Sequence, residues 1–209
     1  MTAIAQIGRS TRKPKGEGHE RRGEILAAAE RIFVEKGYEG ATIRKIAEEV
    51  GLSSTALYMH FADKAEILNE ICRTAFEGLL QRQLECMSTC TDALTCVGEL
   101  AHGYINFGFD HPNAYRLAFM TPTLLAADGS QTVAQKTAAE LYQTFETAVG
   151  RAIEAGTLHG DRAVLTQALW ASVHGLVSLM ITKPHFAWAD RAQLVDAQIN
   201  GMLKGFSRP

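Results

Sequence analysis

The chain has 209 residues, of which 46% are hydrophobic and 21% charged, and its formal net charge is -2. These fractions are close to those of average globular proteins and exclude a disordered or fibrous chain. The longest mainly apolar stretch, residues 168–181, contains His174 and is shorter than the roughly 18 residues that a membrane-spanning helix needs. We therefore expect a globular protein without a membrane segment, long enough for one large domain or two small ones.

The first residues show neither the continuous apolar segment nor the small-residue cleavage site of a secretory signal. We therefore expect the protein to stay in the cytoplasm. Disulfides are rare in that compartment, so the cysteines are expected to be free thiols. They are Cys72, Cys86, Cys90 and Cys96.

Residues 1–18 combine Gly, Ser, Thr, Lys and Pro without periodicity, which predicts a flexible arm. Basic side chains outnumber acidic ones up to residue 22. The acidic residues there are Glu17 and Glu20, and the basic ones are Arg9, Arg12, Lys13, Lys15, Arg21 and Arg22. An arm with this positive excess can neutralise the phosphates of a nucleic acid. A solvated tail of no consequence has the same composition, and both readings stay open.

Two short helices are predicted after this arm and a first helix. Thr42 can cap one of them, and Gly51 allows a sharp exit from it. Ser53 can cap the other, while Leu52 and Leu57 have the spacing of a hydrophobic staple. Two short helices joined by a tight turn at a steep angle are the arrangement that enters the major groove of DNA.

Longer helices precede and follow this pair. Apolar residues recur at helical spacing from Ile25 to Phe33, and Gly37 lies where a left-handed residue would end that helix. Asp63 and Glu66 have capping-box spacing at the start of a helix that runs to about residue 87. Further helical patterns, without any convincing strand, lie at about 92–109, 113–120, 131–155, 162–182 and 190–205.

The N-terminal part of the chain resembles the TetR family of transcription regulators. The resemblance rests on Thr42, Ile46-Ala47, Val50-Gly51-Leu52-Ser53, Leu57-Tyr58, His60-Phe61 and Lys64. It implies an all-α fold in which an N-terminal three-helix helix-turn-helix DNA-binding domain precedes a helical-bundle domain for ligand binding and dimerisation. We accordingly predict a basic arm at 1–18, a DNA-binding domain at 19–65 and a ligand-binding and dimerisation domain at 66–209.

The same resemblance implies which residues contact DNA. Ala56 and Leu57 are expected to face inward with Phe61, which leaves Ser54, Thr55, Tyr58 and Met59 on the outer side of the third helix. The base-facing set matches Arg44, Ser54, Thr55 and Ala56, next to Ser53, and the phosphate contacts match Thr42, Tyr58, His60 and Lys64. These roles fit the chemistry, because a guanidinium suits guanine edges while hydroxyl and ammonium groups suit phosphate.

Each of these residues also has a simple structural interpretation. Tyr58 could be a partly buried tyrosine, Lys64 a solvated lysine in a first turn, and His60 a partner for the last carbonyls of its helix. Thr55 and Met59 stand where the family pattern differs or varies, so the operator sequence is not readable from relatives.

The second half resembles a branch of TetR-like regulators that has a Trp, His, Gly signature. The matching residues are His111-Pro112, Tyr115-Arg116-Leu117, Phe119, Trp170 and His174-Gly175. The branch implies a ligand cavity lined by Tyr104, Phe107, Tyr115, Phe119, Trp170 and His174, and aromatic walls suit an apolar or aromatic molecule. The competing interpretations are that these aromatics are ordinary core, that His174 satisfies a buried carbonyl, and that Gly175 permits close helix approach.

The last two helices carry more apolar surface than one domain needs, and in the family such helices pair with their symmetry mates. A two-fold dimer places two recognition helices about 34 to 36 Å apart, so we expect a palindromic operator on double-stranded DNA. A small-molecule effector would then favour a dimer whose DNA-binding domains no longer fit successive grooves, which is how a repressor is released.

Other functions leave weaker traces. The sequence offers no catalytic set, because Ser53-Ser54 lies in the DNA-binding helix and no paired Glu-x-x-His motif exists, so we expect neither an enzyme nor a cofactor. A redox- or metal-responsive regulator is the alternative, because Cys86 and Cys90 are one helical turn apart and Cys96 follows, although buried thiols also serve as small hydrophobes. An interaction protein that has lost DNA binding is a further alternative.

Overall fold

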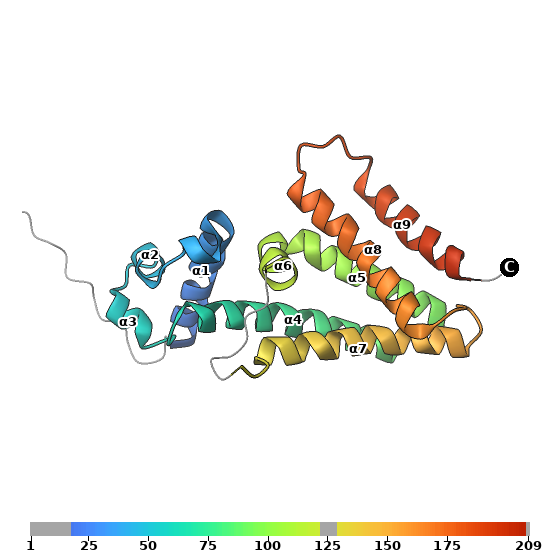
Figure 1. Cartoon of the computed structure of the whole chain (residues 1–209), viewed down its shortest axis with the longest axis horizontal. Coiled ribbons are helices and arrows are strands. Elements are labelled where there is room, and N and C mark those ends of the chain that lie inside the picture. The colour runs from blue at the N-terminus through green and yellow to red at the C-terminus, as the bar shows by residue number, and fades with distance from the viewer. Residues whose placement is uncertain (1–17, 122–128, 208–209) are drawn as a thin grey trace, which may run out of the picture.

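The computed structural model describes residues 18–121 and 129–207, and these residues form nine helices and no strand. The predicted all-α fold is therefore confirmed. The helices are α1 (Gly18–Gly40), α2 (Ile43–Glu49), α3 (Ser54–Tyr58), α4 (Lys64–Thr89), α5 (Ala93–Asp110), α6 (Pro112–Phe119), α7 (Val133–Glu154), α8 (Arg162–Thr182) and α9 (Arg191–Phe206). Helices α1 to α3 form a head at one end of the molecule, and α4 leads from it into the remaining helices (Figure 1).

Local capping fixes where the helices of the head begin. The side-chain oxygen of Thr42 accepts the N–H of Lys45 at 3.2 Å and starts α2, as predicted. Ser53 accepts the N–H of Ala56 at 3.1 Å and starts α3. Each such bond satisfies one of the backbone donors that a helix start leaves unpaired.

The start of α4 follows the predicted capping box only in part. Asp63 accepts the N–H of Glu66 at 2.8 Å. The carboxylate of Glu66 reaches back to the N–H of Ala62 at 2.6 Å, one residue earlier than the capping residue itself. The loop between α3 and α4 is therefore tied down from both sides.

Gly37 interrupts α1 without ending it. Its φ of 71° and ψ of 165° break the helix, but one further turn follows to Gly40. Only glycine adopts this conformation readily, because it has no Cβ atom. Gly37, where the helix was expected to end, is therefore the site of a kink within α1.

The head has its own core, which α4 shares. Ile25, Phe33, Ile46, Leu57 and Ile67 are at most 2% exposed and belong to one cluster. Helix α4 continues past this cluster into a second one that contains Phe76 and Leu79 and the inner faces of α5 to α9. One straight helix thus carries the packing of both halves.

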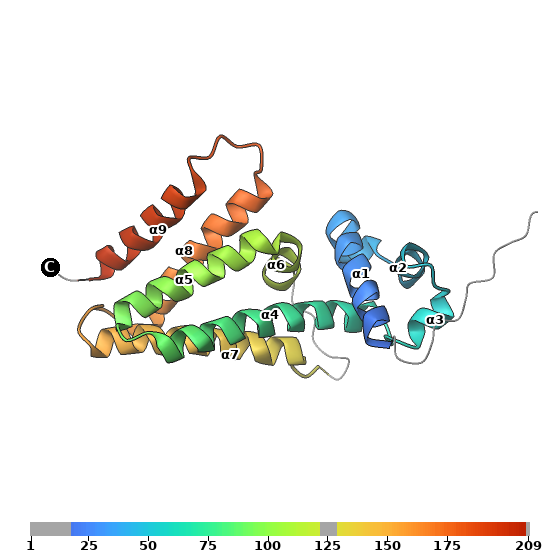
Figure 2. The ribbon, with the colours of Figure 1, turned by 180° about the vertical axis from the view of Figure 1, so that it is seen from behind.

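The second half is a bundle around the far part of α4. Helix α7 runs alongside α4, as both views show, and α5 packs against α4, α7 and α8 (Figures 1 and 2). The short α6 contacts both α4 and α1, so it joins the bundle to the head. Helix α9 forms the outer edge and packs against α5 and α8.

The close helix approach expected at Gly175 occurs at a different glycine. A Cβ atom on Gly175 would meet nothing within 4 Å in the chain, whereas one on Gly108 of α5 would lie 2.4 Å from Cγ1 of Val177. Helices α5 and α8 therefore come together at Gly108. The expectation for Gly175 is wrong within a single chain, because that residue lies away from the α5 contact.

Helix α8 corrects the expectation that no segment is long and apolar enough to span a membrane. Its 21 residues meet that criterion by length and composition, because the apolar pattern extends before residue 168 to Val164 and Leu165. Core helices of globular proteins meet the same criterion. Helix α8 packs against α5, α7 and α9, which covers part of its apolar surface.

The predicted arm, residues 1–18, lies almost entirely outside the described residues. Two cations that were counted with it, Arg21 and Arg22, belong to α1. Arg21 pairs with Glu24, and the Arg22 guanidinium lies 4.0 Å from the Phe61 ring centre and donates a hydrogen bond to the carbonyl of His60. Arg22 therefore packs α1 against the end of α3.

Candidate DNA-binding surface and effector cavity

The turn between α2 and α3 is closed by backbone hydrogen bonds. Gly51 has a φ of 68°, and its N–H donates to the carbonyl of Glu48 at 3.1 Å. The N–H of Leu52 donates to the carbonyl of Ala47 at 2.8 Å. These bonds satisfy the end of α2, and buried Leu57 then anchors α3 in the core of the head.

The helix-turn-helix gathers several of the predicted DNA contacts around one shallow hollow on the surface. Glu39, Ala41 and Ile43 border it together with five of the predicted residues, which are Thr42, Arg44, Ser54, Tyr58 and Lys64. They come from the starts of α2, α3 and α4 and from the end of α3. Hydroxyl, guanidinium and ammonium groups thus converge where a phosphate or a base edge can be contacted.

Exposure separates the predicted contacts into two groups. The Arg44 side chain is 82% exposed, and its Nε donates to Glu48 at 2.8 Å, one turn along α2. Tyr58 is 54% exposed, and Thr42, Ser53 and Thr55 are also exposed. Ser54, Ala56 and His60 are half-buried, so Ala56 does not point fully inward as expected.

Lys64 is more than a solvated lysine of a first turn. Its Nζ donates to the carbonyl of Tyr38 at 3.0 Å, lies 3.6 Å from a carboxylate oxygen of Glu39 and sits 4.2 Å from the Tyr38 ring centre. Burial raises the pKa of Tyr38, and the carboxylates of Asp63 and Glu39 raise it further. Lys64 thus joins the start of α4 to the end of α1 beside the hollow.

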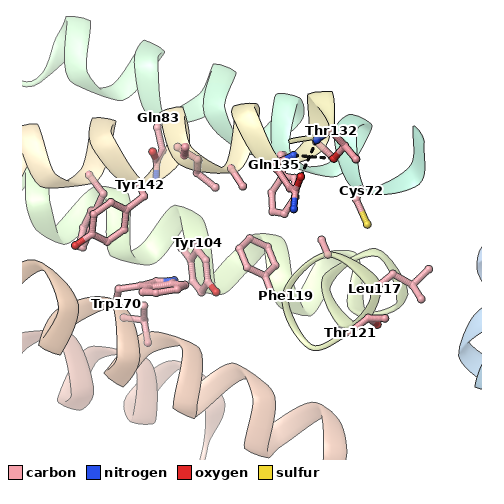
Figure 3. Close-up of a pocket in the computed structure, with 18 of the residues that line it drawn as sticks. Cys72, Gln83, Tyr104, Leu117, Phe119, Thr121, Thr132, Gln135, Tyr142 and Trp170 are labelled. Atoms are coloured by element: carbon pink, nitrogen blue, oxygen red, sulfur yellow. Dashed lines mark hydrogen bonds between the residues drawn. The ribbon is translucent and has the colours of Figure 1, made fainter. Parts of the chain in front are cut away.

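A cavity of about 460 Å³ lies inside the second half (Figure 3). This volume falls within the roughly 300 to 1,000 Å³ that is usual for small-molecule sites. The lining comes from α4 to α8 and the loops around α6, and most of it is apolar. The lining residues are Leu68, Asn69, Cys72, Phe76, Gln83, Leu100, Ala101, Tyr104, Leu117, Ala118, Phe119, Thr121, Thr132, Ala134, Gln135, Ala138, Ala139, Leu141, Tyr142, Phe145, Trp170 and Val173.

Three of the six predicted ligand contacts line this cavity, namely Tyr104, Phe119 and Trp170. Phe107, Tyr115 and His174 are not in its wall. Phe107 is 5% exposed and has its ring centre 6.5 Å from that of Phe119.

Tyr115 and His174 form a polar layer behind the wall. The Tyr104 hydroxyl lies 3.0 Å from the Tyr115 hydroxyl, and Nδ1 of His174 lies 2.6 Å and 3.0 Å from the hydroxyls of Tyr115 and Tyr104. Burial raises the pKa of Tyr104 to about 12, raises that of Tyr115 further, and lowers the pKa of His174. A neutral His174 can therefore accept a hydrogen bond from a tyrosine, and it orients Tyr104.

Gln83 is among the cavity residues that were not predicted from the sequence. Its side chain is 5% exposed and lines the cavity, and its Oε1 has no hydrogen-bond partner among the described residues. An unpaired buried amide oxygen is unfavourable by about 1 to 3 kcal/mol. The sequence held a signal, because Gln83 continues the apolar stripe of Phe76 and Leu79 on α4.

Three other polar residues of the wall already have hydrogen-bond partners. Thr132 and Gln135 form the capping box at the start of α7, with bonds of 2.7 Å and 3.3 Å. Thr121 donates to the carbonyl of Arg116 at 3.1 Å. The labelled side chains place Gln83 and Tyr142 toward one end of the cavity and Cys72 and Thr121 toward the other (Figure 3).

Two lining residues belong to the core of the head as well. Leu68 of α4 and Leu117 of α6 are 4% and 5% exposed, and both pack in the cluster that holds α1 to α3. A change in how these two side chains pack around the cavity would therefore also change the packing of the head.

The remaining cysteines form a separate group. The sulfur atoms of Cys86, Cys90 and Cys96 lie within 4.8 Å of one another, and those of Cys86 and Cys90 are 3.6 Å apart. Burial, together with hydrogen bonding to Cys90, raises the pKa of Cys86 to about 12 and that of Cys96 to about 11. Redox sensing favours a lowered thiol pKa, so these values argue against the redox version of the cysteine hypothesis.

A helix-turn-helix head exposes basic and hydroxyl side chains and is joined to a helical body, α4 to α9, with an internal cavity. This architecture is that of a DNA-binding regulator as a class. Residues 25–71 match the family described as bacterial regulatory proteins of the tetR family. Residues 97–202 match the tetracyclin repressor-like C-terminal domain. The chain therefore belongs to the TetR family, whose members are DNA-binding transcriptional regulators.

Relatives of known function match the chain over part of its length. The transcriptional activator FasR of Mycolicibacterium smegmatis is 31% identical over 111 residues, which cover 53% of this chain and 49% of FasR. The transcriptional repressor KstR2 of Mycobacterium tuberculosis is 35% identical over 79 residues, 38% of this chain and 40% of KstR2. The repressor AcnR of Corynebacterium diphtheriae is 49% identical over 53 residues, 25% of this chain and 28% of AcnR. By sequence, the chain thus matches half or less of the length of these relatives.

Solved structures resemble the whole fold. The TetR family regulator PfmR of Thermus thermophilus has a TM-score of 0.73 at 23% identity, over 88% of this chain and 99% of PfmR. The ketosteroid transcriptional regulator KstR2 of Mycobacterium tuberculosis has a TM-score of 0.74 at 21% identity, over 90% of this chain and 96% of KstR2. At these identities the likeness concerns the fold.

Proposed function

We propose that this regulator reads a palindromic operator as a homodimer and is a repressor released by a small apolar effector. The DNA contacts would be Thr42, Arg44, Ser53, Ser54, Thr55, Ala56, Tyr58, His60 and Lys64, on a DNA-binding domain at 19–65. The observation that carries the proposal is the shared hollow at which Thr42, Arg44, Ser54, Tyr58 and Lys64 meet. The protein would act in the cytoplasm.

The proposed dimer is formed by α8 and α9. Helix α8 is apolar around its whole circumference, yet Val164 is 65% exposed and Leu179 is 52% exposed in the single chain. A helix of this kind normally has all its faces covered. A second copy across α8 and α9 would cover this face and, by two-fold symmetry, would present two recognition helices to one face of DNA.

The effector proposed for the cavity is a largely apolar molecule that carries a hydroxyl or similar group toward Gln83. The apolar wall and the aromatic rings of Phe119 and Trp170 support the apolar part. The unpaired Oε1 of Gln83 supports the polar part. Trp170 lines the cavity, and its ring lies next to that of His174, which hydrogen-bonds to Tyr104 behind the wall. This proximity supports the proposed assignment to the Trp, His, Gly branch.

The proposed link from effector to DNA runs through Leu68 and Leu117. An effector that displaces them would shift the population of head positions, because both residues also pack in the core of the head. A coupling of about 1 to 3 kcal/mol weakens DNA binding roughly 5- to 150-fold. Release on binding describes a repressor, while the relatives include both activators and repressors.

Selection of bound duplexes from a random library, followed by titration of the enriched sequence, tests the DNA-reading function. An enriched palindrome is expected. Arg44→Ala should weaken its binding by about 5- to 150-fold, since a good contact to a base edge is worth about 1 to 3 kcal/mol. Arg82→Ala, on the exposed side of α4, is the matched control and should bind as the wild type does. No enrichment by a folded dimer would contradict the proposal.

A pair of aromatic probes, 2-naphthol and naphthalene, tests the polar end of the cavity. The wild type should bind naphthol more tightly. Gln83→Leu should reduce that preference about 2- to 10-fold, as expected for one hydrogen bond. Gln81→Leu, on the exposed face of the same helix, is the control. An unchanged preference in Gln83→Leu, or no binding of either probe to the wild type, would contradict the proposed site.

A further inference from the structure

Sulfur atoms from two helices converge where α4 ends and α5 begins. Cys86 lies in the last turn of α4, Cys90 is the residue that ends that helix, and Cys96 lies in the first turns of α5. The sulfur atoms of Cys86 and Cys90 are 3.6 Å apart, and all three lie within 4.8 Å of one another. The sulfur of Met87 lies 3.5 Å from that of Cys96 and adds a fourth soft donor.

The spacing of the thiols is that of a coordination site. Thiolates bound at about 2.3 Å to one tetrahedral ion lie about 3.8 Å apart. The sulfur atoms of Cys86 and Cys90, at 3.6 Å, are close to this spacing and no pair among the three is farther apart than 4.8 Å, so small side-chain rotations bring the three sulfur atoms to a common centre. Cysteines that serve only as small hydrophobes fill volume and have no need for their sulfur atoms to converge from two helices.

We propose that Cys86, Cys90 and Cys96 bind one thiophilic metal ion, with a preference for Cu(I) over Zn(II). Among the described residues, this group of possible metal ligands consists of cysteines alone, so every donor atom is sulfur. Thiolate and thioether ligands select Cu(I) and other soft ions. Structural zinc sites instead take a fourth thiolate or an imidazole, which this group does not offer.

The surroundings suit the entry and retention of an ion. Cys96 is 4% exposed and packs in a core cluster with Val97 and Leu100, while Cys86 and Cys90 are only half-buried. An ion can therefore arrive from the side of Cys86 and Cys90 and be held against an apolar wall. Each coordinated thiol releases its proton to solvent when the ion binds.

A bound ion would tie the end of α4 to the first turns of α5. Gln83 lies about one helical turn before Cys86, so the ion would fix α4 next to the polar end of the cavity. The site is separate from the cavity itself, because neither Cys86, Cys90 nor Cys96 lines it. The metal site and the effector site can therefore be tested independently.

Titration of the fully reduced, full-length protein under anaerobic conditions tests the proposal. Cu(I) is supplied in competition with a chromophoric Cu(I) chelator, Zn(II) with a chromophoric zinc chelator, and native mass spectrometry counts the ions. One Cu(I) per chain is expected. Cys90→Ser should weaken its affinity by more than about 100-fold, which exceeds the 10- to 100-fold effect of an outer partner.

Cys72→Ala is the matched control, because Cys72 lines the cavity away from this group. It should leave the affinity for Cu(I) unchanged. Cys90 is half-buried at the end of α4, so Cys90→Ser stays informative even if a change at buried Cys96 prevents folding. Failure of the wild type to compete for Cu(I), unchanged affinity in Cys90→Ser, loss in Cys72→Ala, or tighter binding of Zn(II) would each overturn the proposal.

Discussion

The head and the body of this regulator share helix α4 but differ in where their proposed functional groups lie. Those of the head lie on its outer surface, and those of the body line an internal cavity. In the head the core is filled by residues such as Ile46 and Leu57, both 0% exposed, and the groups proposed for DNA lie on the outside. In the body a cavity of about 460 Å³ interrupts the packing, and the groups proposed for the effector face inward.

This difference explains how the two regions can work together. A filled core resists deformation, so the head can move as one unit and keep its proposed DNA-binding surface intact. A body with a cavity can repack its walls around a ligand. Leu68 and Leu117 line the cavity and also pack in the core of the head, so they form the proposed contact through which repacking in the body would reach the head.

The largest expected effect comes from removing a buried side chain from the core of the head. Leu57→Ala should lower the free energy of unfolding by about 2 to 5 kcal/mol, because it removes a fully buried side chain that anchors α3. Met59→Ala, where the side chain is 84% exposed, should stay within about 0.5 kcal/mol. Urea unfolding of both variants checks this. Equal stability of the two variants would show that α3 is held by something other than Leu57.

An intermediate effect separates binding from transmission. Leu117→Ala should reduce the ratio of DNA affinities without and with effector from about 5- to 150-fold toward unity, because it removes a contact between cavity and head. Leu141→Ala is the control, since Leu141 lines the cavity but packs only in the core of the body. Fluorescence titration of labelled operator measures both ratios. An unaltered ratio in Leu117→Ala would contradict this route.

The smallest effect concerns the layer behind the cavity. Burial lowers the pKa of His174, so the folded protein takes up this proton less readily than the unfolded chain, whose histidine pKa is about 6.5. The contribution of neutral His174 to stability is therefore complete above that pH and is lost as the pH falls below it.

Urea unfolding at about pH 5.5 and pH 7.5 measures this contribution through His174→Gln, which keeps an acceptor for the tyrosines. The wild type should lose more stability than the variant on going to the lower pH. The exposed His185→Gln variant is the control for removing a histidine. If the free energy of unfolding changed equally with pH in the wild type and in His174→Gln, burial would not lower the pKa of His174.

Local sequence determined most of the head. Thr42, Ser53 and Asp63 cap their helices as predicted, because a capping bond joins residues only three positions apart and needs no distant partner. The apolar spacing around Leu57 likewise specifies which face of α3 is buried. That face leaves Tyr58 exposed, whereas Arg44 on α2 was selected through the resemblance to the TetR family.

Only the tertiary structure decided the interior of the body. Helical periodicity shows that a residue faces inward, but it does not show which neighbour it meets or whether space remains. The resemblance to the Trp, His, Gly branch predicts Phe107, Tyr115 and His174 in the cavity wall, but all three lie outside it, whereas Gln83 lines it and its Oε1 has no hydrogen-bond partner among the described residues. The sequence by itself determined helices and their buried faces; the packing of helices distant in the chain decided where a cavity and converging thiols arise, because packing depends on all side chains together.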